Sequence, residues 1–357
     1  VPDSGCGSWL LEDESTNLIT YSEDFSDNSW SKPDTIATNG VVSPSGDASA
    51  FNLLNNNATN QAYTNVNIAV TATNNYTFSA FIKKGNVRYV ALANLNPFTL
   101  TYFDLENGIA LGSTSISSSI KNYGNGWFRC SVETIADTTT KFCGIYLSEN
   151  GTSLSATAIP NGDGIKIWGA QLEQQSYATS YIPTSGATST RLRDIATGSG
   201  NATLINSTEG VLYFEGSFSK NTSNQQLTLN NGTTSERIVL EVRNNGQLLR
   251  FNVRSSDTNS VEIDQSINTD TYYKLGLLWS GSIAKFYLNG SLIGSDSSVT
   301  YPIGLDSMSF NSGTNSFPFY GKTKALAVYK EALTDANLRG LTYPPAVATT
   351  FDLNFNT

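Results

Sequence analysis

The stretch YTFSAFIK, residues 76–83, alternates aromatic or apolar side chains with small or polar ones. A period of two puts alternate side chains on opposite faces of an extended chain, so this stretch is predicted to be a half-buried β-strand. Similar short stretches recur with turn signals about every 8–12 positions, and helical periodicity is nearly absent. Residues 127–133 and 142–147 are predicted to be neighbouring strands around a threonine-rich loop. The pattern is typical of an antiparallel β-sandwich.

A second set of strands begins near Ile205. Residues 238–243 and 248–253 flank the turn Asn244-Asn245-Gly246 and are predicted to form a hairpin. Asn289-Gly290 is a strong hairpin signal, because type I′ turns need a positive φ at both central residues. After the last strand, residues 331–338 are expected to contain a short helix with Thr334 as its N-cap.

The two strand sets predict an all-β protein with two tandem antiparallel β-sandwich, or jelly-roll, domains. A run of small residues at 197–203 separates the sets. We therefore expect an N-terminal segment at 1–16, a first sandwich at 17–193, a linker at 194–204, a second sandwich at 205–342 and a C-terminal tail at 343–357. The tail could pair as an edge strand, contact a neighbouring subunit or be loosely attached.

The composition excludes several classes of active site. The chain of 357 residues contains no histidine, which removes Ser-His-Asp and Cys-His nucleophiles and zinc sites that need imidazole. The net charge is −9 and the 21 Lys and Arg residues are spread out, which argues against nucleic acid as a partner. No apolar run approaches the roughly 18 residues of a membrane span. Only 14% of residues are charged, and such a polar, weakly charged surface suits neutral sugars.

Paired carboxylates carry no glycosidase signature in this chain. Glu149 with Asp163, or Glu241 with Asp264, can be picked out, but their spacing indicates nothing beyond solvated loop charges. We therefore expect a protein that is not an enzyme.

The cysteine count leaves one disulfide open. Cys6, Cys130 and Cys143 are three, and an odd number argues against a complete disulfide framework. Cys130 and Cys143 lie on strands that are predicted to be neighbours, so they could form a bridge or could be two small buried hydrophobic residues.

Four blocks of the first strand set occur together in a known family. They are residues 16–26 with Trp30, then 126–130, 168–173 and 181–186. In this order they resemble the jelly-roll, carbohydrate-binding-like modules of phage tail and spike proteins, over about residues 5–193. The second set, through Trp279, residues 285–290 and the segment ALTDANL at 332–338, resembles the laminin-G/concanavalin A-like lectin fold over about residues 205–342.

Together these resemblances imply a virion appendage, a spike or tail-fibre component, that binds glycans on a bacterial host without catalysis. The implied location is the virion surface or the extracellular space, with other virion proteins as partners. A homotrimer would add avidity to weak single sites. Two alternatives stay open. One is a structural capsid or tail decoration protein without a ligand. The other is the accessory modules of a polysaccharide-degrading enzyme.

Aromatic residues are the first candidates for a sugar site, because sugar rings stack on aromatic faces while their hydroxyls pair with polar side chains. Trp127, Trp168 and Trp279 are expected in the cores. Trp30 sits among polar residues and is a candidate for an exposed ligand-binding ring. The segment Phe317-Pro318-Phe319-Tyr320 follows a polar loop at 311–316, and its three aromatic residues could form a contact patch or enter the core as the next strand.

A structural calcium ion is the one cofactor that the sequence suggests. β-Sandwich modules often hold calcium with loop carboxylates and carbonyls. Asp24, Asp27 and Asp163, with Glu23 beside them, are candidate ligands. The chain has no Asp-x-Asp loop at these positions to support them.

Overall fold

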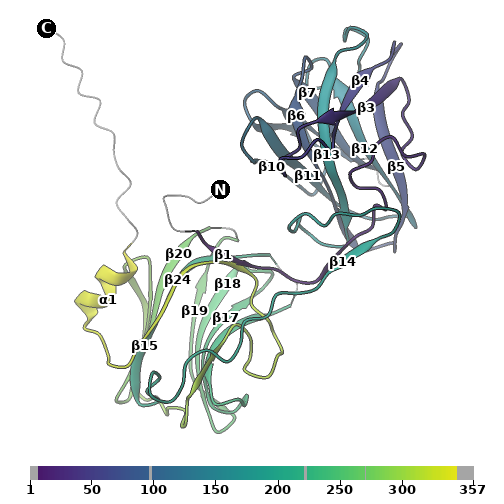
Figure 1. The fold of residues 1–357 in the computed structure, drawn as a ribbon. Coiled ribbons are helices and arrows are strands. Elements are labelled where there is room, and N and C mark those ends of the chain that lie inside the picture. Colours follow the sequence, from purple (N-terminus) through teal and green to yellow (C-terminus); the bar gives the residue numbers. More distant parts are fainter. Residues whose placement is uncertain (1–6, 96–98, 221–222, 270, 344–357) are drawn as a thin grey trace, which may run out of the picture. The chain divides into compact units, whose positions relative to one another are not determined.

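The computed structural model describes residues 7–95, 99–220, 223–269 and 271–343. Nearly all regular structure in these residues is β-strand, arranged in antiparallel sheets, which confirms the predicted fold class (Figure 1). The chain forms two compact units. The N-terminal unit is Asp13–Arg193, and the C-terminal unit consists of Val1–Glu12 with Asp194–Thr357.

The N-terminal unit is a sandwich of a six-stranded and a five-stranded sheet. In spatial order, the six-stranded sheet is β10 (Ser117–Asn122), β11 (Trp127–Ile135), β6 (Asn75–Lys84), β13 (Gly164–Glu173), β4 (Ala50–Asn55) and β3 (Thr35–Val41). The five-stranded sheet is β5 (Tyr63–Ala69), β12 (Thr140–Ser148), β7 (Tyr89–Leu95), β8 (Leu100–Asp104) and β9 (Ile109–Ser113). A short pair, β2 (Ser15–Asn17) and β14 (Ser189–Arg191), joins the first and last segments of the unit.

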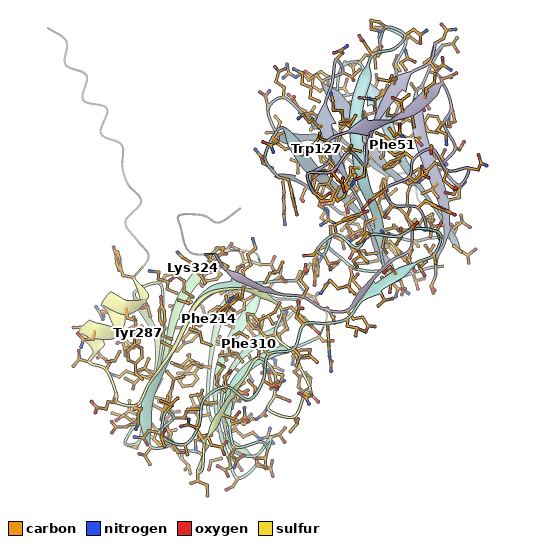
Figure 2. All side chains as sticks on the ribbon, in the orientation of Figure 1. Phe51, Trp127, Phe214, Tyr287, Phe310 and Lys324 are labelled. Atoms are coloured by element: carbon orange, nitrogen blue, oxygen red, sulfur yellow. The ribbon has the colours of Figure 1, made fainter. Side chains whose placement is uncertain are left out.

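Strand β6 shows how the alternating sequence builds this core. Tyr76, Phe78, Ala80 and Ile82 belong to the main buried cluster, which Phe51 of β4 also joins (Figure 2). Phe81, between them in sequence, belongs to a separate cluster on the outer face of the same sheet. The period of two therefore divides the side chains between the two faces of the strand as predicted. The prediction of a half-buried strand is wrong, because Thr77, Ser79 and Phe81 on the outer face are buried as well.

Cys130 and Cys143 come from opposite sheets of this sandwich and are both free thiols. Both are buried in the main cluster, and burial raises the pKa of each thiol. The interpretation as small buried hydrophobic residues is confirmed, and the disulfide alternative is wrong. Cys6 lies outside the described residues.

The C-terminal unit is a second sandwich, also of a six-stranded and a five-stranded sheet. The six-stranded sheet is β1 (Trp9–Leu11), β24 (Gly321–Tyr329), β15 (Glu209–Phe218), β20 (Tyr273–Ser280), β21 (Ile283–Leu288) and β22 (Ser291–Asp296). The five-stranded sheet is β19 (Thr258–Ser266), β18 (Leu248–Ser255), β17 (Arg237–Arg243), β16 (Gln225–Asn230) and β23 (Ser307–Ser309). Phe214 and Phe310 are among the rings that fill the core between the sheets (Figure 2).

Local signals in the second set fall where the sequence placed them. Asn289 and Gly290 have φ values of 47° and 80° and form the turn between β21 and β22. The helix α1 (Asp335–Thr342) starts after Thr334, whose side chain accepts a hydrogen bond from the amide of Asn337. This is the predicted N-cap.

Two expected boundary segments belong to the C-terminal unit instead. Strand β1 pairs with β24, so part of the expected N-terminal segment 1–16 is an edge strand of this unit. The expected linker at 194–204 is also wrong as a free connection, because Ser199 and Met308 exchange backbone hydrogen bonds of 3.1 and 2.7 Å. The sequence could not show these pairings, since their partners lie more than a hundred residues away. The tail beyond Tyr343 lies outside the described residues.

Candidate functional site

Trp30 is not the exposed ring that the sequence suggested. Its exposed fraction is 1%, its ring lies 4.7 Å from that of Phe25, and its Nε1 donates to the carbonyl of Tyr21 at 2.8 Å. Asp27 caps the tight turn before it, accepting from the amide of Ser29 at 2.8 Å. The polar neighbours of Trp30 make the turn, and the turn directs the ring into the core. The prediction of an exposed ligand-binding residue here is wrong.

The aromatic patch at 317–320 divides in the same way. Phe319 and Tyr320 are buried, and the Phe319 ring lies 5.4–5.7 Å from those of Phe214, Phe218 and Phe310. A contact patch that includes these two residues is wrong. The alternative is correct in that both are buried, although they precede the strand β24, which begins at Gly321. Phe317 is 47% exposed, with a φ of 53°, so its role as a ligand contact stays a prediction.

The carboxylates that were candidate calcium ligands accept hydrogen bonds from nearby residues. Asp24 accepts from the Ser26 amide at 3.0 Å, and Asp163 accepts from the Asn86 side chain at 2.6 Å. Hydrogen bonds from Ser29 lower the pKa of Asp27. Over the described residues, no three His, Cys, Asp or Glu side chains gather into a group that could hold a metal ion. The structure does not bring these three carboxylates together, and calcium stays a prediction without support from their placement.

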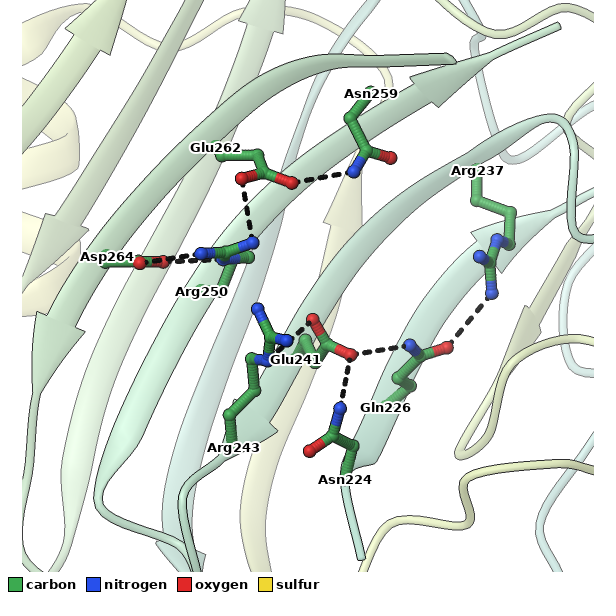
Figure 3. Close-up of polar contacts among 9 residues, drawn as sticks. All are labelled: Asn224, Gln226, Arg237, Glu241, Arg243, Arg250, Asn259, Glu262 and Asp264. Carbon is green, nitrogen blue, oxygen red and sulfur yellow. Dashed lines mark hydrogen bonds and ion pairs between the residues drawn. The ribbon is translucent and has the colours of Figure 1, made fainter. Parts of the chain in front are cut away.

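The outer face of the five-stranded sheet in the C-terminal unit carries a dense polar network, which we call the polar face (Figure 3). It consists of the outward side chains of β16 to β19 and their ends: Asn224, Gln226, Arg237, Glu241, Arg243, Arg250, Asn252, Arg254, Asp257, Asn259, Glu262 and Asp264. Alternation explains it, because Ile238, Leu240 and Val242 of β17 point into the core. The residues between them must then point outward.

Arg250 is the centre of the first half of the network. Its guanidinium binds Asp264 through two bonds, Nε to Oδ1 at 2.7 Å and Nη2 to Oδ2 at 2.8 Å (Figure 3). Its third nitrogen lies 2.8 Å from Glu262, which also accepts from Asn259 at 2.6 Å. These charge-assisted bonds raise the pKa of Arg250 and lower the pKa of Asp264.

Glu241 is the centre of the second half. It accepts from the side-chain amides of Gln226 at 3.0 Å and Asn224 at 3.3 Å, and it forms an ion pair with Arg243 at 3.8 Å (Figure 3). Gln226 in turn accepts from Arg237 Nη1 at 3.0 Å. Each carboxylate on this face therefore has a donor, and the amide of Gln226 links Glu241 to Arg237.

Three polar atoms of the same face have no bonding partner among the described residues. They are Nε of Arg237, Nε of Arg254 and Oδ1 of Asn252. Arg237 and Arg254 lie directly opposite each other on β17 and β18. Burial, followed by repulsion from Arg254, lowers the pKa of Arg237. All three atoms are buried, and because an unsatisfied buried polar group costs about 1–3 kcal/mol, this corner of the face is less stable than a fully bonded one.

One part of the polar face is buried, whereas Glu262, Asp264 and Asp257 are exposed. Gln226, Arg237 and Asn252 are each less than a tenth exposed, although they point away from the core. The segment after β23 contributes to this burial. The backbone carbonyl of Ser312 accepts a hydrogen bond from Arg237 at 3.1 Å, and that of Phe317 accepts one from the backbone N–H of Gln226 at 2.9 Å. Exposed Phe317 thus lies on the segment that borders the face.

The chemistry of this face suits binding better than proton transfer. Glu241 and Asp264, read from the sequence as loop charges, are on strands, and Arg250 stands between them in the cross-strand row. A general acid needs a raised pKa, whereas that of Asp264 is lowered. The second pair, Glu149 and Asp163, accepts local hydrogen bonds from Ala158 and Asn86.

Sequence reasoning missed the polar face, although its signal is present. The segments RIVLEVR at 237–243 and LLRFNVR at 248–254 alternate charged or amide side chains with aliphatic ones. The polar positions of that alternation predict that Arg237, Arg243, Arg250 and Arg254 share one face of the sheet.

Comparison with known proteins agrees with the fold of the C-terminal unit. Residues 184–339 match the family model Laminin_G_3, described as the concanavalin A-like lectin/glucanases superfamily. No match was found among curated proteins. The match supports the resemblance of the second strand set to the laminin-G/concanavalin A-like lectin fold.

Comparison with solved structures finds chains of low similarity. The CBM40 of the Ruminococcus gnavus IT-sialidase, bound to alpha2,3 sialyllactose, has 20% identity and a TM-score of 0.36, over 42% of this chain and 95% of that one. Domains LG4-5 of the mouse laminin alpha1 chain have 12% identity and a TM-score of 0.29, over 79% and 92%. The heptameric SAP-like pentraxin of Limulus polyphemus has 16% identity and a TM-score of 0.32, over 40% and 72%.

No helix in the described part of the chain is both long and apolar enough to cross a membrane.

Proposed function

We propose that this protein is a non-catalytic glycan-binding protein, and that the polar face of its C-terminal unit is a glycan site. The observation that carries the proposal is the partly buried network of guanidinium, amide and carboxylate groups on one face of a lectin-like sandwich. Sugar hydroxyls both donate and accept hydrogen bonds, and this face presents both kinds of partner within a few ångströms of each other.

The charges of the face favour a neutral glycan. Four arginines, at 237, 243, 250 and 254, are matched by four acidic residues, at 241, 257, 262 and 264. Arg250 is paired with Asp264 and Glu262, and Arg254 lies 3.4 Å from Asp257. A face that neutralises itself has little long-range attraction for ions, so specificity comes from hydrogen bonds.

The Arg254 corner is the part of the face that we expect to contact ligand. Arg254 and Asn252 share the outward side of β18, and 31% of the Arg254 side chain is exposed. A sugar that approaches this corner can offer hydroxyls to the exposed part of Arg254. The Oδ1 atom of Asn252, which has no partner among the described residues, is buried and becomes available only when the side chains around it move. Exposed Phe317, on the bordering segment, is a candidate for stacking on the ring.

Glycan-array binding by the wild type and two variants tests the proposal. The variant Asn252→Ala/Arg254→Gln should bind the recognised neutral glycan about tenfold more weakly, since two hydrogen bonds are worth roughly 1–3 kcal/mol together. The matched control Asn337→Ala/Arg339→Gln makes the same changes on the exposed surface of α1, and should bind like the wild type. Equal binding by all three proteins would refute the site.

The setting that we propose for this binding is the surface of a virion, as a spike or tail-fibre component that holds bacterial host glycans. The order of sequence blocks at 16–30, 126–130, 168–173 and 181–186 supports this setting. A trimer would multiply weak contacts, because binding through a second copy is intramolecular. Immunogold labelling of purified virions and light scattering of the pure protein test the two parts. A protein absent from virions and monomeric in solution would contradict this setting, while leaving the glycan site intact.

A further inference from the structure

The outer face of the six-stranded sheet in the N-terminal unit holds two lysines directly opposite each other. Lys83 of β6 and Lys166 of β13 are registered partners in adjacent antiparallel strands. Both point outward, because Ile82 and Ile165 beside them belong to the core. Like charges that face each other across a strand pair destabilise a sheet.

No acidic side chain in the described part of the chain forms an ion pair with these lysines. The side chains of Lys83 and Lys166 make no ion pair or hydrogen bond with any residue that the structure describes. On the same face, Glu133 of β11 lies opposite Thr77, which is six residues from Lys83 along β6, or about 20 Å. Two uncompensated cations in the middle of a sheet are unexpected in a chain with a net charge of −9.

A third cation widens the positive area. Lys121 of β10 lies opposite Arg129 of β11 and points to the same outer side, because Ile120 packs against the core. Lys121 likewise has no ion pair or hydrogen bond among the described residues. Arg129 differs, since its guanidinium donates to Ser79 at 3.0 Å and lies over the ring of Phe81.

Aromatic rings stand beside the lysines. Trp127 is the registered partner of Lys83 on its other side (Figure 2 labels Trp127), and it belongs to a buried cluster with Phe81 and Trp168. Tyr123 bonds Trp127 through its backbone amide at 2.8 Å, and its ring meets that of Phe81 edge-on at 4.9 Å. Tyr123 is 45% exposed, so it offers a ring face to a ligand that the buried tryptophans cannot.

The side chain of Lys83 is positioned by the turn beside Trp127. A Cβ atom at Gly126 would lie 3.4–3.8 Å from three carbons of the Lys83 stem. The stem therefore runs along this turn. On the far side of Lys166, its registered partner is Asn52 of β4, whose side-chain amide donates a hydrogen bond to the Thr38 hydroxyl at 3.4 Å.

We infer that the row Tyr123, Lys83, Lys166 and Asn52 is a second binding site, and that its ligand is an anionic glycan. The row covers four strand spacings, about 19 Å, which suits an oligosaccharide rather than a single sugar. The ammonium groups bind carboxylate or sulfate, Tyr123 stacks on a ring and Asn52 pairs with a hydroxyl. A bound anion also removes the repulsion between the two lysines.

Dextran and its charged derivatives provide a direct test, because the sugar backbone is constant. Affinity electrophoresis of the full chain in carboxymethyl-dextran or dextran sulfate should show retardation that plain dextran does not cause. Replacing both lysines, in Lys83→Gln/Lys166→Gln, should weaken this binding at least about tenfold, since each charged hydrogen bond is worth roughly 1.5–3 kcal/mol. Comparing the two derivatives distinguishes carboxylate from sulfate.

Two further variants separate binding from folding. Lys83→Arg/Lys166→Arg keeps both charges and should keep binding. Lys84→Gln/Lys330→Gln removes the same net charge elsewhere, at a lysine that pairs with Glu106 and at one on the other unit, and should bind like the wild type. Equal losses in the two glutamine variants would overturn the site, because they would indicate a general charge effect.

The nature of the ligand has its own control. Poly-glutamate carries the same charge without sugar rings, and we expect it to bind more weakly than carboxymethyl-dextran. Tyr123→Ala should narrow that difference. Equal binding of poly-glutamate and carboxymethyl-dextran by the wild type would overturn the glycan and indicate an acidic protein segment. The site lies on the other unit from the polar face, so its failure leaves the proposed function untouched.

Discussion

The two units each present the outer face of one sheet, and the two faces are built by opposite rules. On the polar face of the C-terminal unit, Arg250 holds Asp264 and Glu262, and amides join the remaining groups. On the N-terminal unit, Lys83 and Lys166 stand opposite each other without an acidic partner. The charges of the polar face are paired with one another, whereas the charges of the two lysines are not paired within the described residues.

This difference separates stability from function. Paired charges on a sheet contribute to folding, so their presence alone says little about a ligand. Unpaired like charges oppose folding, so a role outside folding has to explain them. On the polar face, only the corner with unpartnered atoms therefore indicates a binding role. In the row that contains Lys83 and Lys166, the arrangement of the two charges itself indicates a binding role.

The largest expected effect concerns the core beneath these faces. Trp30→Ala should destabilise the N-terminal unit by about 3–5 kcal/mol and lower its melting temperature by roughly 6–20 °C, because it empties a fully buried site. Calorimetry measures the shift, and hydrogen exchange shows which unit is affected. Trp9→Ala, at a ring that is 75% exposed on β1, is the matched control and should change stability by less than about 0.5 kcal/mol. Similar shifts for both would contradict the placement of Trp30.

A smaller effect distinguishes the two faces directly. Arg250→Gln leaves Asp264 and Glu262 without their cation and should cost the C-terminal unit about 1 kcal/mol. Lys83→Gln removes a repulsion and should leave the N-terminal unit as stable as before, or slightly more stable. Urea unfolding curves of the two variants measure both effects. If Lys83→Gln were as destabilising as Arg250→Gln, the lysine would have a structural partner and the contrast would fail.

The smallest effect is the pH dependence that Asp264 of the polar face contributes to stability. Hydrogen bonds from Arg250 hold the pKa of Asp264 below its ordinary value. The stabilisation from this carboxylate is therefore complete above the unfolded pKa of about 3.9 and is lost as the pH falls through the lowered folded pKa. The melting temperature of Asp264→Asn should lie below that of the wild type at pH 7, and the gap should close towards pH 3.

The control for this pH series is Lys83→Gln/Lys166→Gln, which removes no hydrogen bond or ion pair to a carboxylate. Its offset from the wild type should be the same at pH 7 and pH 3. A gap for Asp264→Asn that stays constant across the series would mean that Arg250 does not stabilise the ionised carboxyl.

Much of the fold followed from local sequence signals. The alternation at 76–83 identified a strand and both of its faces, Asn289-Gly290 identified a turn, and Thr334 identified a helix cap. Each of these depends on residues within a few positions of one another. The pairing of β1 with β24 and of Ser199 with Met308 depends on distant segments, and composition gave no sign of either.

The candidate sites could be predicted less well from the sequence, because they also depend on contacts between distant segments. Polar neighbours suggested that Trp30 was exposed, but the turn capped by Asp27 points its ring inward. The arginines of the polar face alternate visibly in sequence, yet which acid each one meets depends on the register of three strands. Likewise, Lys83 and Lys166 are eighty-three positions apart, and only the sheet makes them neighbours.

Binding of one glycan panel by three proteins tests the central claim, that the chain carries two glycan sites of different chemistry. The proteins are the wild type, Asn252→Ala/Arg254→Gln and Lys83→Gln/Lys166→Gln, and the panel contains neutral glycans together with dextran and its charged derivatives. We predict that the first variant loses neutral glycans and keeps anionic ones, and that the second does the reverse. If both variants lost the same glycans, or if neither lost any, the account of two distinct faces would be contradicted.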